Sequence, residues 1–461
     1  MKVIVIGCTH AGTAAVKTLA KLNNNIDITV YEKNNNVSFL SCGIALYVGG
    51  IAKDVNKLFY SSPDELTSLG AKMFMEHEVL EINPEKKHVI VKDLKTGKEE
   101  VDNYDKLVMT TGSWPIVPPI EGINLDNILL SKNFNQANEI IAKAKDVKHI
   151  TVIGAGYIGV ELVEAFALNG KQVTLIDGEN RILNKYLDKE FTDLVETEFK
   201  ARNIELALQQ TVVKFAGNEQ GQVTKVVTTK GEYSTDLVIL CVGFRPNTAL
   251  LKGKVDLLPN GAIKINEYMQ SSDPDIYAAG DSCAVNYNPT GEKVYIPLAT
   301  NAVRMGTLVG YNLAGQKLKY IGTQGTSGLH IFGYNMASTG LTEVSANAAG
   351  IAYEKVEIAE NNRPEFMPSY DQVLLKVLYD KNTRRILGAQ IISKADLTQM
   401  INTLSVCIQT KMSIDELGFM DFFFQPHFNK PWNTLNQAGL IALETDKAKD
   451  QEISGNTVVW A

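Results

Sequence analysis

The sequence has no arrangement of cysteine or histidine residues that would hold a metal ion or a local disulfide bond. Its five cysteines are scattered with no C-x-x-C pair, and its six histidines form no zinc-binding pattern. We therefore expect no metal site. Scattered cysteines are typical of a reducing compartment, so we expect a cytoplasmic location. The cysteines are Cys8, Cys42, Cys241, Cys283 and Cys407.

Long apolar runs and an excess of basic residues are also missing. No run approaches the roughly 18 residues that a membrane-spanning helix needs. The apolar start of the chain stops at Gly7 without a cleavage-site pattern, which indicates a strand and not a signal peptide. The formal net charge of -7 and the pI near 5.6 argue against a nucleic acid or a membrane as the main partner. With 461 residues, the chain can bury the cores of roughly two to four domains.

A dinucleotide-binding pattern is present at the N-terminus. An apolar strand at 3–6 leads into the turn G-C-T-H-A-G, which starts at Gly7, and a helical pattern and a second strand at 26–31 follow. The second strand ends at Glu32, whose carboxylate suits the ribose hydroxyls of a nucleotide. A threonine replaces the middle glycine of the fingerprint, but Gly7 permits the tight turn and Gly12 permits close packing of the helix. The pyrophosphate would then lie at the helix N-terminus.

The same pattern returns in the middle of the chain. A strand at 149–153 runs into G-A-G-Y-I-G, which starts at Gly154, and after a helix the strand at 172–176 ends at Asp177. This is a complete G-x-G-x-x-G fingerprint in the right context. An aspartate at this place accepts both ribose hydroxyls and repels a 2′-phosphate, which favours NAD(H) over NADP(H), although Arg181 lies nearby.

Two fingerprints indicate two dinucleotides. The usual division is one bound flavin and one exchangeable nicotinamide. The alternative is a duplicated fold with one inactive site, and the presence of both ribose-binding acids argues against it.

The strands that follow each fingerprint have comparable ends. Strands at 104–109 and 236–241 each run into small residues and a glycine, which indicates an exit from a nucleotide domain. A later strand ends at Asp281, which could cap a helix or hold a ribityl chain. The last part of the chain contains alternating patterns at 373–379 and 386–392 that predict antiparallel strands.

We place the chemistry in the stretch 38–50, S-F-L-S-C-G-I-A-L-Y-V-G-G. We predict a helix at 44–48 with Cys42 at its N-terminus, where backbone N–H groups and the helix dipole favour the reactive thiolate. Ser41 and Gly43 leave room beside the sulfur for a ligand. The alternative is a cysteine that only packs within the structure.

His10 falls inside the first turn, at the phosphates of the dinucleotide and in the same domain as Cys42. We interpret it as a proton donor or as a partner of the thiolate. The alternative is a side chain that caps or packs.

The segment 420–432, M-D-F-F-F-Q-P-H-F-N-K-P-W, is aromatic and interrupted by proline. As a loop it would expose a large apolar surface. We therefore expect it to contact a partner subunit.

These motifs resemble the pyridine nucleotide–disulfide oxidoreductase superfamily over nearly the whole chain. G-C-T-H-A-G at Gly7, S-F-L-S-C-G at Ser38 and F-F-F-Q-P at Phe422 are similar to its NADH oxidase and NADH peroxidase group, which has a single redox cysteine in place of a C-x4-C disulfide. No second cysteine lies within five residues of Cys42. Coenzyme A-disulfide reductases share the fold but usually have an asparagine where this chain has Ser41. Within the group, G-C-T-H-A-G and G-I-A-L-Y look more like the water-forming NADH oxidases than the peroxidases.

The resemblance implies an α/β fold with two Rossmann-like dinucleotide-binding domains and a C-terminal α+β dimerisation domain. The predicted division is an FAD-binding domain at 1–115 and 246–324, an NADH-binding domain at 116–245, and an interface domain at 325–461.

The resemblance also implies the site residues. Cys42 and His10 would be catalytic and would lie at the flavin. FAD would be contacted further by Gly7, Ala11, Gly12, Glu32, Lys33, Val79, Thr110, Gly112, Ser113, Lys132, Asp281 and Ala299. NADH would be contacted by Gly154, Gly156, Tyr157, Ile158, Gly159, Asp177, Tyr186 and Gly243, with Tyr157 covering the flavin until the nicotinamide displaces it. Phe424 and Gln425 would approach the flavin of the other subunit.

The implied activity is that of an FAD-dependent NADH oxidase, which reduces O2 to water with four electrons from two NADH. The electrons would pass through the flavin and through a Cys42 thiolate that cycles with its sulfenic acid. An NADH peroxidase, a coenzyme A-disulfide reductase, an NADH-reading redox sensor and an electron-transfer reductase for a protein partner remain alternatives. We expect a homodimer or a higher homo-oligomer.

Overall fold

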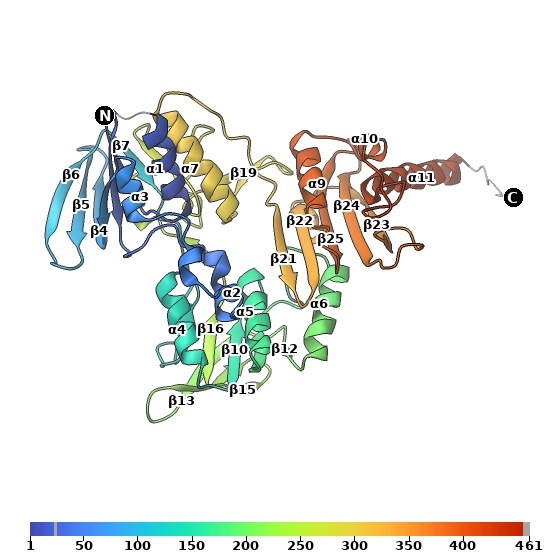
Figure 1. Cartoon of the computed structure of the whole chain (residues 1–461), viewed down its shortest axis with the longest axis horizontal. Helices are drawn as coiled ribbons and strands as arrows, with labels where there is room; N and C mark the ends of the chain where they lie inside the picture. Colours follow the sequence, from blue (N-terminus) through green and yellow to red (C-terminus); the bar gives the residue numbers. More distant parts are fainter. Residues whose placement is uncertain (23–24, 455–461) are drawn as a thin grey trace. The chain divides into compact units, whose positions relative to one another are not determined.

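The N-terminal dinucleotide pattern forms a five-stranded parallel sheet with the order β18-β7-β1-β2-β3. Figure 1 labels its strand β7 and the helices α1 and α7, which lie side by side. Val3, Ile4 and Val5 of its central strand are buried, as expected for a parallel sheet that is covered on both faces. Helix α1 packs against α7 so closely that a Cβ atom at Gly306 would lie 2.1 Å from the carbonyl oxygen of Ala11. The bounds are β1 (Lys2–Ile6), α1 (His10–Leu22), β2 (Asp27–Glu32), β3 (Lys72–Met75), β7 (Lys106–Met109), β18 (Ile276–Ala278) and α7 (Ala299–Leu313).

This computed structural model describes residues 1–22 and 25–454, and the chain folds as two units. Unit 1 comprises 1–178, 210–286 and 292–322. Unit 2 comprises 179–209, 287–291 and the described residues from 323 onward. The predicted domain boundaries stay a prediction.

The second dinucleotide pattern also forms a parallel sheet in unit 1. Strand β10 pairs with β11 on one side and with β16 on the other, and β16 pairs with β9. The predicted strands at 149–153 and 172–176 are confirmed residue for residue. The bounds are β9 (Ile128–Leu130), α4 (Phe134–Ala144), β10 (His149–Ile153), α5 (Tyr157–Leu168), β11 (Gln172–Ile176) and β16 (Leu237–Leu240).

The two predicted exits from the nucleotide domains pair with each other. Strands β8 (Ser113–Pro115) and β17 (Phe244–Pro246) form a two-stranded antiparallel ribbon. The chain therefore leaves the first nucleotide-binding fold through β8 and returns to it through β17, and these two strands are paired with each other.

Unit 1 also contains the predicted helix at 44–48, together with antiparallel strands and other short helices that the sequence patterns did not predict. Two three-stranded sheets have the orders β4-β5-β6 and β13-β14-β15. In these strands charged residues alternate irregularly with apolar ones. The strands contain no nucleotide-binding motif. The bounds are η1 (Ser41–Gly43), α2 (Ile44–Val48), η2 (Val55–Leu58), α3 (Pro63–Ser68), β4 (His77–Asn83), β5 (His88–Asp93), β6 (Glu99–Asn103), β13 (Val212–Gly217), β14 (Val223–Thr228), β15 (Glu232–Ser234) and η3 (Ala249–Leu251); β19 (Val285–Tyr287) and β20 (Glu292–Val294) pair where the chain passes between the units.

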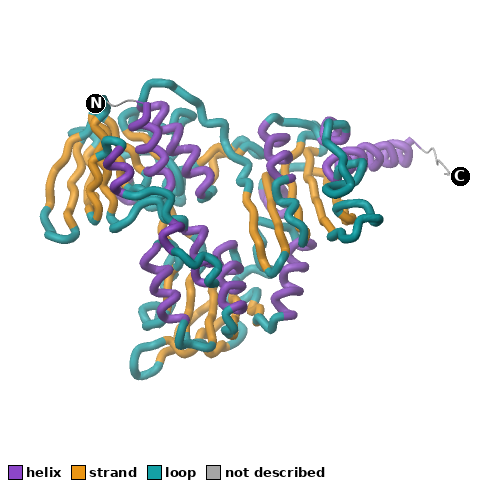
Figure 2. The backbone as a smooth tube through the Cα atoms, viewed as in Figure 1, coloured by secondary structure: helices purple, strands orange, loops and turns teal. Residues whose placement is uncertain are grey.

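Unit 2 is built on a five-stranded antiparallel sheet with the order β21-β22-β25-β24-β23, which confirms the predicted antiparallel strands (Figure 2). Apolar side chains of α9, α10 and α11 complete the core on this sheet. No helix among the described residues is long and apolar enough to span a membrane. The bounds are α6 (Lys189–Ala201), β12 (Glu205–Ala207), β21 (Ser327–Ile331), β22 (Tyr334–Gly340), α8 (Glu343–Ala348), β23 (Tyr353–Asn361), β24 (Gln372–Asp380), β25 (Ile386–Ser393), α9 (Met400–Gln409), α10 (Ile414–Gly418) and α11 (Thr434–Ser454).

Candidate active site

The first glycine turn brings three backbone segments into close contact. Gly7 has a φ of +87°, and a Cβ atom there would lie 2.7 Å from the carbonyl oxygen of Thr110. A Cβ atom at Gly12 would lie 2.1 Å from the carbonyl oxygen of Gly7. The Thr110 hydroxyl donates to the Gly7 carbonyl at 2.7 Å. Only glycine fits at both positions, as a turn against which a phosphate can lie requires.

Glu32 ends β2 with a buried carboxylate beside this turn. It accepts hydrogen bonds from the backbone N–H groups of Cys8, at 2.6 Å, and Asn34, at 2.8 Å. Burial raises its pKa, although these hydrogen bonds act in the opposite direction. The carboxylate is therefore fixed at the strand end where a ribose would bind.

Cys42 lies in the 3-10 turn η1, directly before the predicted helix, which is confirmed as α2. Its side chain is exposed, yet surrounding protein atoms desolvate the sulfur. This desolvation and the charge of Glu161 raise the pKa of the thiol, and they outweigh the Lys132 ammonium and the backbone N–H group, which lower it. The pKa of the Cys42 thiol is thus raised, whereas the position at the helix start was expected to lower it. The pKa is set by burial and by a carboxylate.

The room that Gly43 was expected to leave for a ligand is taken by protein. A Cβ atom at this position would lie 2.6 Å from the Cδ2 atom of Leu58. The glycine is therefore needed for packing of the cysteine turn against η2.

His10 opens α1 and is paired with Tyr60. Its Nδ1 atom lies 3.0 Å from the Tyr60 hydroxyl, and the two rings are stacked with centroids 5.8 Å apart. The Tyr60 hydroxyl has one proton and also contacts the Thr9 carbonyl, which can only accept. Both contacts are satisfied when Nδ1 of His10 donates, which leaves a lone pair on Nε2. Burial lowers the pKa of His10, so the neutral ring predominates at pH 7.

A charged cluster stands beside both candidate catalytic residues. The Lys132 ammonium contacts the Ser113 hydroxyl at 3.0 Å and the Asp281 carboxylate at 3.2 Å. Lys132 and Asp281 both act on the pKa of Cys42 and on that of His10. The same two charges act on both residues, which supports the prediction that Cys42 and His10 belong to one site.

The residues of this region fit a bound FAD. A Cβ atom at Gly7 or at Gly12 would lie within 3 Å of a backbone carbonyl oxygen, so the turn that would hold the phosphates is open only because both residues are glycine. The glycine turn, the fixed carboxylate of Glu32 and the lysine–aspartate pair supply the contacts that a dinucleotide needs. The other residues predicted for FAD also lie in unit 1: Ala11 in α1, Lys33 after β2, Val79 in β4, Gly112 at a φ of +64° and Ala299 at the start of α7.

The second glycine turn repeats this geometry. Gly154 has a φ of +104°, and a Cβ atom at Gly159 would lie 1.8 Å from the carbonyl oxygen of Gly154. The Asp177 carboxylate accepts a hydrogen bond at 2.5 Å from the backbone N–H of Ala155. Asp177 is thus held at the turn by the backbone. Of the other residues predicted for NADH, Gly156 caps α5, Tyr157 and Ile158 begin it, and Gly243 follows β16 with a φ of +103°.

Arg181 and Tyr186 belong to unit 2. The Arg181 side chain is buried, and its guanidinium group donates to the carbonyl oxygens of Asn184 and Leu187. These hydrogen bonds give Arg181 a local structural role. This argues against a role for its guanidinium group in binding the 2′-phosphate of NADP(H). Tyr186 is 37% exposed.

The predicted aromatic segment is an exposed loop in unit 2. Phe423, Phe428 and Trp432 are 69%, 64% and 54% exposed. Phe424 is also exposed, and the Gln425 side chain accepts a hydrogen bond from the backbone N–H of His427 at 2.7 Å. Contiguous exposed aromatic groups are typical of an interface.

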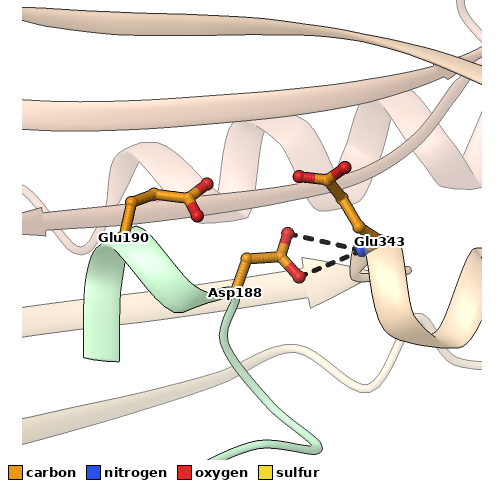
Figure 3. Close-up of side chains that lie close together, drawn as sticks. All are labelled: Asp188, Glu190 and Glu343. Atoms are coloured by element: carbon orange, nitrogen blue, oxygen red, sulfur yellow. Dashed lines mark hydrogen bonds between the residues drawn. The ribbon is translucent and has the colours of Figure 1, made fainter. Parts of the chain in front are cut away.

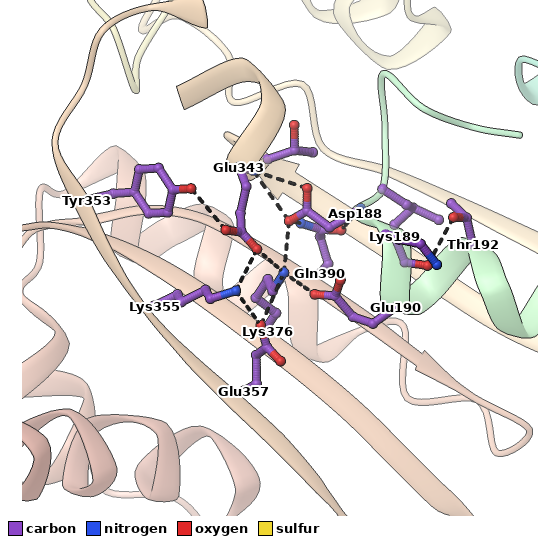
Figure 4. Close-up of polar contacts among 12 residues, drawn as sticks. Asp188, Lys189, Glu190, Thr192, Glu343, Tyr353, Lys355, Glu357, Lys376 and Gln390 are labelled. Atoms are coloured by element: carbon purple, nitrogen blue, oxygen red, sulfur yellow. Dashed lines mark hydrogen bonds and ion pairs between the residues drawn. The ribbon is translucent and has the colours of Figure 1, made fainter. Parts of the chain in front are cut away.

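A second polar cluster lies in unit 2, where Asp188, Glu190 and Glu343 bring carboxylates together within 4.8 Å (Figure 3). Figure 4 shows the ammonium group of Lys376 among them. This lysine is fully buried and pairs with all three carboxylates and with Glu357. The ammonium supplies the positive charge that a metal would supply, so we assign no metal here.

This cluster has a structural role. Gln390 donates to Asp188 at 2.7 Å, and the backbone N–H of Glu343 donates to the same carboxylate. Burial opposes ionisation of Glu343, but hydrogen bonds from Lys376, Lys355 and Tyr353 lower its pKa to about 2. A buried ion pair of this kind holds its partners in one geometry. It anchors the segment 183–191, which carries Tyr186, to β24 and β25.

Sequence reasoning missed Tyr60, Glu161 and Lys376. Tyr60 lies outside any motif, Glu161 falls inside a helical pattern, and Lys376 lies in a strand where a lysine suggests a solvated face. Their roles depend on burial and on neighbours far away in the sequence. One local feature could have marked Glu161 as a candidate site residue. It is the second residue after the G-A-G-Y-I-G fingerprint.

Comparisons with known proteins agree with this geometry. Residues 1–306 match the family model of the pyridine nucleotide-disulphide oxidoreductases, and residues 326–435 match the model of their dimerisation domain. The chain is 60% identical to an NADH oxidase of Enterococcus faecalis, over 96% of this chain and all of the relative. A solved water-forming NADH oxidase from Lactobacillus brevis, bound to NADH, superimposes with a TM-score of 0.96 at 52% identity, over 97% of this chain and 99% of the other.

A more distant relative is an NAD(P)H coenzyme A polysulfide/persulfide reductase of Pyrococcus horikoshii, 34% identical over 94% of this chain and 96% of the relative. The predicted resemblance and fold class are confirmed. The family is FAD-dependent, and FAD is accordingly the cofactor of this chain. With two dinucleotide folds, a dimerisation domain and relatives matched over nearly their whole length, the chain belongs to the pyridine nucleotide-disulphide oxidoreductase family.

Proposed function

We propose that this chain is a water-forming NADH oxidase in which Cys42 consumes the peroxide that oxygen reduction produces. The observation that carries the proposal is the placement of Cys42. It is the one exposed cysteine among the five. The charges of Lys132 and Asp281 act on both Cys42 and His10. The names of the relatives support NADH and O2 as the substrates.

Bound FAD would accept a hydride from NADH and pass electrons on to oxygen. The residues of the chain would then complete the reduction. The Cys42 thiolate attacks H2O2, so that an S–O bond forms, the O–O bond breaks, and the leaving hydroxide takes a proton to become the first water. Two further electrons, which a second NADH would supply through the flavin, and two protons convert the sulfenic acid back to the thiol and release the second water. The other cysteines are at least partly buried, which protects the sulfenic acid from disulfide formation.

His10 would handle protons in this sequence as a neutral base. Its Nε2 lone pair is available because Nδ1 is committed to Tyr60. It can accept the Cys42 proton when the thiolate forms and return it to the leaving hydroxide. The exposed aromatic loop of unit 2 would contact a second subunit and place Phe424 and Gln425 at its flavin, which makes a homodimer the proposed assembly.

The experiment that tests the proposal is the ratio of NADH to O2 consumed, measured with and without catalase. A water-forming oxidase consumes about two NADH per O2 in both conditions. A peroxide-forming oxidase consumes about one NADH per O2, and catalase then returns half of the O2. An NADH peroxidase shows little O2 uptake and responds only to added H2O2, and either of these last two results would refute the proposal.

Asp177 should determine the preference for NADH. Replacing it by alanine removes the carboxylate that would accept the ribose hydroxyls and repel a 2′-phosphate. We expect the KM for NADH to rise roughly tenfold, as the loss of a charged hydrogen bond predicts, and the preference over NADPH to narrow. Steady-state kinetics with both coenzymes would measure this, with Glu219→Ala, at an exposed turn of unit 1, as the control. If the wild type already uses NADPH as well as NADH, the assignment of Asp177 is wrong.

A further inference from the structure

A carboxyl group that the mechanism above does not use lies on the face of α5 that packs against α2. Residues four apart share a helix face, so Glu161, Ala165 and Asn169 form one row along α5. The Asn169 side chain donates to the carbonyl oxygen of Val48 at 3.0 Å. A Cβ atom at Gly49 would lie 3.3 Å from that of Ala165. The row therefore faces the helix that follows the cysteine turn.

Glu161 has no compensating charge at this place. No cation or hydrogen-bond donor among the described residues pairs with its carboxyl group, while burial and the charge of Glu164 raise its pKa to about 7. Its charge acts on Cys42 and is, after burial, the largest influence that raises the pKa of that thiol. Helix α2 and strands β10 and β11 pack against α5 and have no acidic residue. The remaining titratable groups on α5, on these elements or around Cys42 are Tyr157, Tyr47, His149, Lys132 and Asp281.

We propose that Glu161 is a positioning residue whose charge controls how much thiolate Cys42 holds. A neutral carboxyl group permits the thiolate, and an ionised one suppresses it. The proposal rests on the proposed role of Cys42 and assigns a second acid–base group to the same site. Since the two groups interact, they titrate as a coupled pair.

Coupling predicts a specific shape for the pH dependence of the thiolate. Below about pH 7 Glu161 is neutral, and the thiolate fraction rises tenfold for each pH unit. As the pH passes through this value, ionisation of Glu161 opposes ionisation of Cys42. For a coupling of up to about one pKa unit, the rise slows to roughly threefold per pH unit over an interval that we call the flat region. Once Glu161 is fully ionised its charge no longer changes, and the rise returns to tenfold per pH unit. A carboxyl group with a purely structural role would produce no flat region.

The test is the rate at which iodoacetamide alkylates Cys42 in the reduced holoenzyme, followed from about pH 5.5 to pH 9.5 by mass spectrometry of the Cys42 peptide. The wild type should show the flat region, beginning near pH 7. Glu161→Gln should show no flat region and should keep the tenfold rise per pH unit until the thiol itself becomes ionised. Its rate should equal that of the wild type at the acidic end and exceed it by roughly 3- to 10-fold above pH 8, because a like charge nearby shifts a pKa by up to about one unit.

Two further variants separate charge from packing. Glu164→Gln removes the repulsion that raises the pKa of Glu161, so the flat region should move to lower pH. Glu161→Asp keeps a carboxyl group, and the flat region should return. Flavin absorbance and circular dichroism would verify that each variant is folded and loaded.

A Glu161→Gln profile parallel to that of the wild type, whether faster or slower at every pH, would overturn the proposal, because it would show a packing effect alone. A wild-type profile without a flat region would do the same. The labelling reports the thiolate and not the product of turnover. Its result is therefore independent of whether the enzyme forms water, and failure of one proposal is distinguishable from failure of the other.

Discussion

The Cys42→Ser enzyme is expected to oxidise NADH and to release H2O2 in place of water. Serine keeps the size of the side chain, but its hydroxyl stays protonated at neutral pH and cannot attack peroxide. The first two-electron step does not involve the sulfur, so it should continue. The product should change to about one H2O2 per NADH, whereas the wild type consumes about two NADH per O2.

The measurement is an oxygen electrode trace combined with a peroxide assay and an NADH assay. Cys241→Ser is the matched control, because Cys241 is the other cysteine that is not fully buried, and burial raises the pKa of its thiol to about 12. This control should still form water. A sulfenic-acid probe should label Cys42 and none of the other four cysteines.

Continued water formation by a fully flavinated Cys42→Ser enzyme would falsify the assignment of Cys42 as the redox centre. Complete loss of O2 uptake would indicate that the cysteine is needed before peroxide forms, which also contradicts the proposed order. A structural cysteine would change neither the product nor the ratio.

The sequence was most informative where local pattern decides structure. The strand, glycine turn, helix, strand and acid of each dinucleotide fold follow one another within about 30 residues. Their bounds were therefore predictable, as the agreement of 149–153 with β10 shows. The pairing of β8 with β17 was not predicted, because it joins segments that lie more than 100 residues apart in the sequence.

What the sequence could not predict depends on tertiary burial. The position of Cys42 before a helix favoured a thiolate, but desolvation and the charge of Glu161, which lies more than 100 residues further along the chain, raise its pKa. Lys376 lies in a predicted strand, yet it is fully buried because carboxylates from three distant segments surround it. No periodicity or spacing in one sequence carries this information, because it depends on which segments the fold brings together.

Replacing His10 by alanine is expected to leave FAD bound and to slow turnover by ~10²-fold, the usual effect of removing a general base. The flavin should stay because the glycine turn holds phosphate through its backbone, which the substitution does not change. The loss should come from Nε2, whose lone pair is free while Nδ1 contacts Tyr60. Tyr60→Phe is the matched variant. It retains the base and removes the hydroxyl that orients it, so its loss should be smaller.

The pH dependence provides an independent test of the same role. Burial lowers the pKa of His10 below its ordinary value near 6.5, so the ring is neutral and can accept a proton at pH 7. As the pH falls through this lowered pKa, the ring becomes protonated and the base is lost. Wild-type turnover should therefore decline at acidic pH, and the residual turnover of His10→Ala should lack that decline. Unchanged turnover in a His10→Ala enzyme with full flavin occupancy would reduce His10 to a packing residue, because a base that acts on Cys42 cannot be removed without effect.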